Sequence, residues 1–269
     1  MSNASSTHDH AASEATMLGP RRYRHPVSFG RLVLIHLQIW RAQKGVVAGC
    51  LLAFAAGLVA VGATMARLSG PVTGAAVGSR FTGLPFAVFS LLWLAVGAIA
   101  AAAPIKSGWA AVVLTVAPRR GRWLAACLVS FLLLAVAVTA LFAVLAVAVT
   151  VAVLAANGQD PAPALAIGRP AGLMLLLVAI QAGVGFLLGA ATRSVTASII
   201  IGYVLAPALP AAKFGSVDLG RWLDLNGALS TISAGHPDGY ALLSVLSAMA
   251  LWVVVPALVA WSRLRSWVG

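Results

Sequence analysis

Six long stretches of this chain contain no Asp, Glu, Lys, Arg or His. They cover residues 46–66, 84–103, 123–156, 171–191, 195–212 and 241–261. An α-helix rises 1.5 Å per residue, so about 20 apolar residues cross the ~30 Å hydrocarbon core of a bilayer. Five of the stretches have 18 to 21 residues, and the third has 34. We predict six membrane-spanning helices, the third one tilted or with its ends outside the hydrocarbon.

Composition supports an all-α integral membrane protein. Hydrophobic residues make up 61% of the chain and charged residues 9%, against about 45–50% and about 25% in soluble proteins. A membrane β-barrel is excluded, because it would need alternating segments of about ten residues. The net charge of +12 is sparse and divided by apolar stretches, which excludes a nucleic-acid partner. Cys50 and Cys127 lie in apolar stretches, so we expect small buried side chains rather than a disulfide.

The basic residues predict the orientation of the chain. Thirteen of the 18 Lys and Arg fall before the first stretch, after the last, or in the second and fourth connections; the other five lie in the remaining connections. The positive-inside rule then places both termini in the cytoplasm of a multi-pass protein of the cell membrane. We expect residues 1–25, which are polar and without periodicity, to be a disordered cytoplasmic tail rather than a signal peptide. Residues 26–269 would form the membrane domain.

The spans lack the groups that catalysis and ion coupling use. Ion-driven carriers normally place ionisable side chains at membrane depth, although backbone carbonyls alone can bind Na⁺. Gly183-Val184-Gly185 resembles the start of a nucleotide-binding fingerprint, but it lies inside a span. No nucleophile has a base nearby. We therefore expect no enzymatic activity and no cofactor in this chain, and energy for any transport would come from another protein.

The polar and small residues of the spans predict helix packing. Gln181 carries the side chain that is most costly to bury in lipid, and we favour an interhelical hydrogen bond over substrate contact for it. Tyr203 is a second candidate for either role. Small residues recur at every fourth position in two rows: Gly45, Gly49, Ala53 and Gly57, and Gly185 and Gly189. Such rows allow close helix contact, within the chain or across a dimer.

Three segments outside the spans carry further information. In residues 26–44, Phe29, Val33, Leu37 and Trp40 share one helical face, which predicts an interfacial amphipathic helix; the alternative is an extension of the first span. The connection 104–122 is basic and partly apolar, typical of a short helix that docks on another protein. Residues 213–240 are too polar for a span and could hold interfacial or re-entrant helices.

A family resemblance follows from several short motifs in order. They are Ala117-Pro118-Arg119-Arg120-Gly121-Arg122-Trp123-Leu124, Gly108 ten residues before that proline, Gly189-Ala190-Ala191-Thr192-Arg193-Ser194, and Trp222-Leu223. Over about residues 26–267 the chain resembles the membrane (permease) subunits of type-2 ATP-binding-cassette (ABC) exporters, especially the small actinobacterial type. Pro104 stands where members of that family often have a glutamate.

The resemblance implies a permease that exports a hydrophobic or amphipathic solute: a drug, antibiotic, lipid or peptide. Separate cytoplasmic ATPase subunits would bind ATP and Mg²⁺, and the permease would pair with a second copy or a sister permease. The connection between the second and third spans would form a coupling helix seated on the ATPase. The residues expected there are Gly108, Val112, Val113, Leu114, Val116, Pro118, Arg119, Arg120 and Arg122. The alternative is a non-transport membrane protein, such as an assembly factor or sensor.

Overall fold

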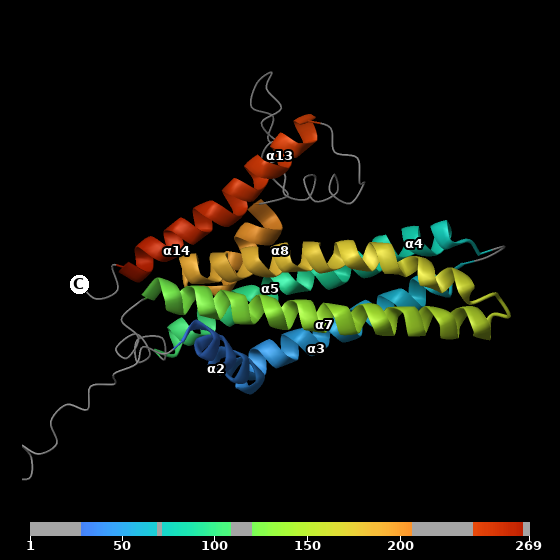
Figure 1. Ribbon diagram of the computed structural model, residues 1–269, viewed down its shortest axis with the longest axis horizontal. Helices are drawn as coiled ribbons and strands as arrows, with labels where there is room; N and C mark the ends of the chain where they lie inside the picture. Colours follow the sequence, from blue (N-terminus) through green and yellow to red (C-terminus); the bar gives the residue numbers. More distant parts are fainter. Residues whose placement is uncertain (1–27, 69–71, 109–119, 206–238, 266–269) are drawn as a thin grey trace, which may run out of the picture.

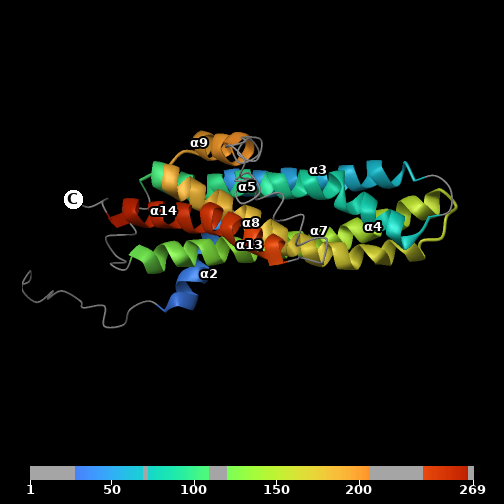
Figure 2. The same ribbon diagram turned by 90° about the horizontal axis from the view of Figure 1, so that it is seen from above.

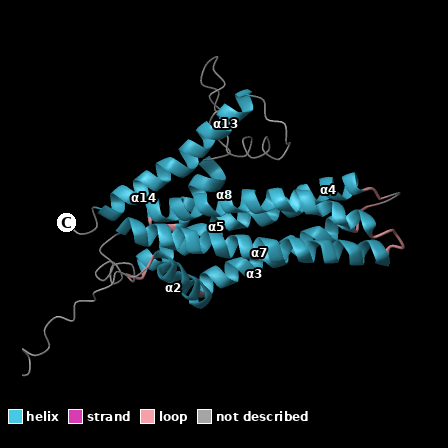
Figure 3. Cartoon of the chain, viewed as in Figure 1, coloured by secondary structure: helices cyan, strands magenta, loops and turns pink. Residues whose placement is uncertain are grey.

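The computed structural model describes residues 28–68, 72–108, 120–205 and 239–265, and their regular elements are all helical (Figure 3). Five helical stretches are long and apolar enough to cross a membrane: Lys44–Met65, Gly74–Lys106, Arg120–Ala156, Ala162–Thr192 and Leu242–Arg265. They confirm a multi-pass membrane protein. For the stretch 195–212, the described part forms the shorter apolar helix Val195–Val204 and residues 206–212 lie outside the description. A sixth span therefore stays a prediction.

Helix α2 (Phe29–Ala42) is separate from α3 (Lys44–Met65). Ser28 begins α2, where its side chain accepts a 3.3 Å hydrogen bond from the amide of Arg31. Gln43 ends it in an extended conformation (φ −79°, ψ 101°). Because of this break, α2 turns and packs against α7 (Arg120–Ala156) instead of prolonging the first span (Figure 1). The helix is thus confirmed and the extension alternative is wrong. Of its predicted apolar face, Val33 and Trp40 are buried and Leu37 is half-buried, while Phe29 is exposed. Its place at a membrane interface stays a prediction.

The connection after α3 contains a helix that the sequence analysis missed. Thr73 begins α4 (Gly74–Thr82), where its hydroxyl accepts a 3.3 Å hydrogen bond from the amide of Ala76. Gly83 then separates α4 from α5 (Leu84–Lys106). α4 packs against the 3-10 segment η1 (Ala162–Ile167) at the end of the bundle away from α2 (Figure 2).

The third span is a single helix, as predicted. α7 has 37 residues, which corresponds to about 55 Å and exceeds the ~30 Å hydrocarbon core. Its first turn includes Arg120 and Arg122, and α5 includes Lys106, so all three belong to helix ends rather than to the connection 104–122. This corrects the predicted bounds of that connection, because the helices continue past the apolar stretches that defined the spans.

The later helices include two π-helical segments. α8 (Gly168–Thr192) is followed, after Arg193 and Ser194, by α9 (Val195–Ile200) and the π segment η2 (Ile201–Leu205). The last helical stretch comprises α13 (Gly239–Met249), the π segment η3 (Ala250–Val254) and α14 (Val255–Arg265). Pro256 follows η3 and has no N–H for the preceding turn, which accounts for irregular hydrogen bonding there. This stretch runs obliquely to the bundle (Figure 1).

The rows of small residues pack helices within this chain. A Cβ atom at Gly185 of α8 would lie 2.0 Å from the carbonyl oxygen of Leu94 in α5. At Gly97 of α5, a Cβ atom would lie 2.4 Å from the carbonyl oxygen of Ala182. Gly49 brings α3 similarly close to Val96, since a Cβ atom there would be 2.8 Å from a methyl group of Val96. Backbone-to-backbone contact without side chains therefore joins α5 to α8.

Aromatic side chains fill the interior between these helices. Phe89 stacks on Phe142 with ring centroids 4.0 Å apart, and Trp93 lies 6.2 Å from Phe89. Phe131 continues the row, with centroids 6.1 Å from Trp93 and 5.8 Å from Phe186. All five side chains are buried. Within the described bundle, these rings form a continuous row of buried aromatic contacts.

Candidate functional site

Basic residues collect at one end of the bundle, called here the basic end, where α3 and α7 begin and α5, α8 and α14 end (Figure 1). The described basic residues at this end are Arg31, Arg41, Lys44, Lys106, Arg120, Arg122, Arg193, Arg263 and Arg265. Three described basic residues belong to the opposite end: Arg67, Arg80 and Arg169. Asp160, also at the opposite end, is the single acidic residue in the part of the chain that the structure describes. The orientation of this end in the membrane stays a prediction of the positive-inside rule.

Two arginines from outside α14 cap its end. Arg120 donates from Nη1 to the carbonyl oxygens of Leu264 and Arg265, at 3.0 and 2.9 Å. Arg193 donates from Nη2 to the carbonyl oxygen of Arg263, at 3.0 Å. The last carbonyls of a helix lack intrahelical partners and form the negative end of its dipole, so both contacts are favourable. They join the start of α7 and the α8–α9 turn to the end of α14.

The backbone brings these arginines into reach. Arg193 adopts a left-handed conformation (φ 56°) immediately after α8, a position that usually carries glycine. Gly121 lets α14 approach α7, because a Cβ atom there would lie 2.0 Å from the Trp261 ring. Trp261 in turn supports Arg265, whose guanidinium carbon lies 4.9 Å from the ring centroid. The sequence did not predict that the backbone carbonyls of Arg263 and Arg265 accept hydrogen bonds from other segments. The one indication was the place of both residues in the last turn of a helix.

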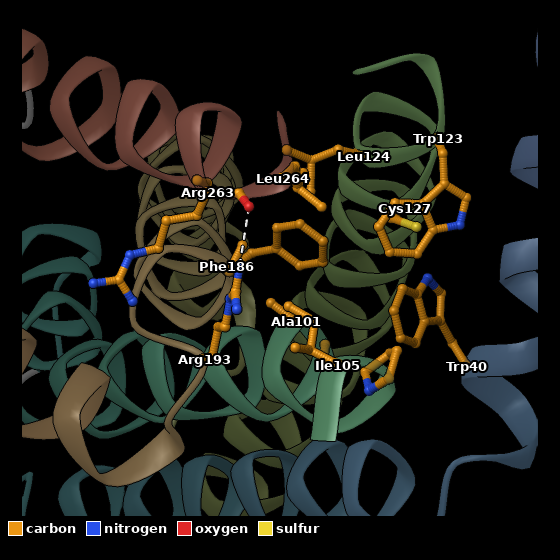
Figure 4. A pocket seen from close by; sticks show the side chains of 14 residues that line it. Trp40, Ala101, Ile105, Trp123, Leu124, Cys127, Phe186, Arg193, Arg263 and Leu264 are labelled. Atoms are coloured by element: carbon orange, nitrogen blue, oxygen red, sulfur yellow. Dashed lines mark hydrogen bonds between the residues drawn. The ribbon is translucent and has the colours of Figure 1, made fainter. Parts of the chain in front are cut away.

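A small pocket lies beside this cap (Figure 4). Its lining comprises Trp40, Ala100, Ala101, Pro104, Ile105, Trp123, Leu124, Cys127, Phe186, Ala190, Arg193, Ala260, Arg263 and Leu264. Arg193 and Arg263 lie on one side of it, opposite Trp40 and Trp123. The volume of about 10 Å³ is that of one water molecule, so the pocket is too small to enclose a solute.

Helix α2 closes the far side of the pocket. Trp40 donates from Nε1 to the hydroxyl of Ser130 at 2.9 Å, and His36 lies between the rings of Trp40 and Trp123, at centroid distances of 6.4 and 6.1 Å. Nδ1 of His36 is 2.7 Å from the carbonyl oxygen of Leu32. Burial lowers the pKa of His36, and the contact with Leu32 opposes this only in part. Burial therefore favours the neutral form of His36 in the packed helix.

The predicted coupling residues fall into two groups. Gly108 is exposed just after α5, with φ 72°, and Arg120 and Arg122 are half-buried in the first turn of α7. The others lie outside the described residues: Val112, Val113, Leu114, Val116, Pro118 and Arg119. Both flanks of the connection emerge at the basic end, but the coupling helix itself stays a prediction.

Gln181 and Tyr203 occupy different environments. Gln181 is 5% exposed in α8, and its Oε1 accepts no hydrogen bond within the described ranges. The predicted interhelical bond of Gln181 is therefore not observed there. The half-buried Tyr203 does make such a bond, because its hydroxyl donates to the carbonyl oxygen of Leu91 in α5.

No cluster of three His, Cys, Asp or Glu side chains that could hold a metal ion occurs among the described residues, and Cys50 and Cys127 are free thiols.

No known protein family, curated protein or solved structure matches this chain. The assignment of function therefore rests on the sequence motifs and on the geometry of the basic end.

Proposed function

We propose that this protein is the membrane subunit of an ABC-type exporter for a hydrophobic or amphipathic solute. The observation that carries the proposal is the pair of contacts from Arg120 and Arg193 to the end of α14. Arg120 directly follows the connection between α5 and α7, where the ATPase would dock. A movement of this connection would be transmitted to the last span by the hydrogen bonds that Arg120 donates to the end of α14. Arg193 extends the same link to the α8–α9 turn.

The energy source would be a separate ATPase that binds ATP and Mg²⁺. The six apolar stretches carry no phosphate-binding loop and no Asp, Glu, Lys, Arg or His for ion coupling. The connection combines basic residues with the apolar Val113 and Leu114, a composition suited to a protein partner. This chain then transports without itself being an enzyme.

The solute would move along the outside of the bundle. The aromatic row from Phe142 to Phe186 fills the interior of a single chain, and the pocket at the basic end has the volume of one water molecule. A path between this chain and a second copy or a sister permease fits these facts. Apolar side chains such as Val59 and Val144 are exposed on the outer surface and can face a partner permease or lipid.

The filled interior also favours a second candidate, a non-transport membrane protein such as an assembly factor or sensor. Such a protein needs no solute path and no ATPase. The two candidates differ in one observable property, which is binding of an ATPase at the connection between α5 and α7.

The test is co-purification with a candidate ABC ATPase, sought first in the neighbouring reading frames, using the double substitution Val113→Asp and Leu114→Asp. Burying two unpaired carboxylates at the interface costs several kcal/mol, so ATPase recovery should fall at least tenfold while membrane insertion stays normal. The matched control is Leu165→Asp, because Leu165 is 76% exposed in η1 at the opposite end. Undiminished recovery and transport with V113D/L114D would refute docking at this connection.

A further inference from the structure

Helix α2 presents an exposed face opposite the one that packs on the rest of the protein. Val33, His36 and Trp40 are buried in that packing. The exposed face, called here the outer face of α2, mixes basic, apolar and polar side chains: Arg31, Leu34, Ile35, Gln38 and Arg41. At 3.6 residues per turn these five positions fall within an arc of about 120°. The predicted pattern with Val33 and Trp40 therefore serves internal packing, and a different face meets the surroundings.

The position of α2 along the bundle sets the level of this face. α2 lies at the outer edge of the bundle beside α7 (Figure 2). His36 packs against Trp123, the first residue of the stretch without charged side chains. Trp40 bonds to Ser130, which lies about 10 Å further along α7. The headgroup region of a bilayer is about 5–7 Å deep on each side of the hydrocarbon. α2 therefore lies at the level where headgroups meet acyl chains.

The side chains of the outer face are available to a ligand. Among the described residues, the guanidinium groups of Arg31 and Arg41 make no hydrogen bond, ion pair or ring contact. Between the two arginines, Leu34 is 62% exposed and Ile35 is 40% exposed. A ligand that complements this face has an anionic group and an apolar chain side by side.

We infer that the outer face of α2 binds anionic phospholipids of the membrane leaflet at the basic end. Arg31 and Arg41 contact the phosphates, because a long arginine side chain reaches the headgroups from a helix that lies lower. Leu34 and Ile35 contact the acyl chains. Free phosphate would meet the same arginines but would leave both apolar side chains in water, so the lipid is the favoured source of the anion.

This site gives α2 a partner on each side. The bond from Trp40 to Ser130 holds its inner face on α7, and lipid covers its outer face. Bound lipid then lies next to the first turns of α7. The inference does not depend on an ATPase partner, and it holds equally for a non-transport protein.

The experiment places a fluorophore on the outer face. In a C50A/C127A background, the full chain with Gln38→Cys is labelled and reconstituted in nanodiscs of phosphatidylglycerol and phosphatidylcholine in equal amounts. One of the two lipids carries brominated acyl chains, which quench the fluorophore on contact. We expect brominated phosphatidylglycerol to quench more strongly than brominated phosphatidylcholine. Two arginines near a membrane surface together favour an anionic lipid about 25-fold.

Substitutions of the arginines test which groups cause the preference. Arg31→Gln and Arg41→Gln should each reduce the preference for phosphatidylglycerol about fivefold, and R31Q/R41Q should leave nearly equal quenching by the two lipids. Arg80→Gln is the matched control, because Arg80 is an exposed arginine of α4 at the opposite end of the bundle. It should leave the preference unchanged.

Several outcomes would overturn the inference. Equal quenching by the two lipids with both arginines intact would show no anionic preference, and weak quenching by both would show that the face does not meet acyl chains. A loss with R80Q equal to that with R31Q/R41Q would remove the assignment to α2. Loss of the preference in excess inorganic phosphate at constant ionic strength would assign the arginines to a free anion. The first comparison needs no arginine variant, so it decides even if R31Q/R41Q is unstable.

Discussion

Trp40 of α2 donates a 2.9 Å hydrogen bond from Nε1 to the hydroxyl of Ser130 in α7, and both side chains are buried. This bond joins residues 90 positions apart in the chain. It fixes α2 against the third span at the side of the pocket opposite Arg193 and Arg263 (Figure 4). The amphipathic helix is thus part of the folded domain.

Ser130→Ala should loosen α2. The substitution leaves the indole N–H of Trp40 buried without a partner, which costs about 1–3 kcal/mol of unfolding free energy. Hydrogen exchange of α2 amides and unfolding in mixed micelles measure the effect. Ser262→Ala is the control, because the exposed hydroxyl of Ser262 bonds only locally to Val259; it should change stability by less than about 0.5 kcal/mol. Equal effects of both substitutions would show that the Trp40–Ser130 bond does not hold α2.

Gly185→Ala should separate α5 from α8. The new methyl group would overlap the backbone of Leu94, which cannot move aside as a flexible side chain can. Overpacking of this kind costs about 1–3 kcal/mol. Gly172→Ala in the same helix is the matched control, since no atom lies within 4 Å of the added methyl group. It should leave stability unchanged or raise it by up to about 1 kcal/mol through helix propensity. A loss with G172A equal to that with G185A would contradict the close contact.

His36 should make the docking of α2 sensitive to acid. Burial lowers the pKa of His36 below its ordinary value of 6.5, so the detached helix binds a proton more readily than the docked one. The contribution of His36 to the free energy of docking is therefore complete above pH 6.5. It decreases as the pH falls from 6.5 towards the lowered pKa of the docked state. Hydrogen exchange of α2 amides on both sides of this range measures the change. His36→Gln should remove the dependence; an unchanged pH profile in H36Q would assign it to other groups.

Cysteine labelling tests the orientation of the basic end. Ser107 and Asn157 are exposed at opposite ends of the bundle, and neither has the left-handed backbone that disfavours a side chain at Gly108 and Gly158. In a C50A/C127A background, an impermeant reagent added outside should label N157C and spare S107C. Labelling of S107C in sealed cells would reverse the proposed orientation.

The sequence predicts those helices whose position is set by local composition. The unbroken apolar stretch after Trp123 predicts the single long α7, and the periodic Phe29, Val33, Leu37 and Trp40 predict α2. α4 was missed because residues 74–82 are mixed in polarity, and its stability comes from packing on η1 as well as from the Thr73 cap. Local pattern alone carries no signal for such tertiary support.

The candidate site was harder to predict than the spans. The motif around Arg120 indicated the segment that contains the site. The contacts of Arg120 with Leu264 and Arg265, however, join residues 144 and 145 positions apart in the chain. Both partners are backbone carbonyls, which any residue supplies, so no pair of side chains reveals the contact. Arg193 was visible as the charge between two apolar stretches, while its left-handed conformation and its reach to α14 required the fold.

The most direct test of the proposed function is ATP hydrolysis by the purified chain, alone and with a candidate ABC ATPase, in the same proteoliposomes. The account predicts no hydrolysis by the chain alone. With the ATPase present, we expect vanadate-sensitive hydrolysis and ATP-driven solute movement, both reduced by V113D/L114D and unchanged by L165D. Hydrolysis by the isolated, contaminant-free chain, or a reconstituted ATPase whose activity ignores this chain, would contradict the account.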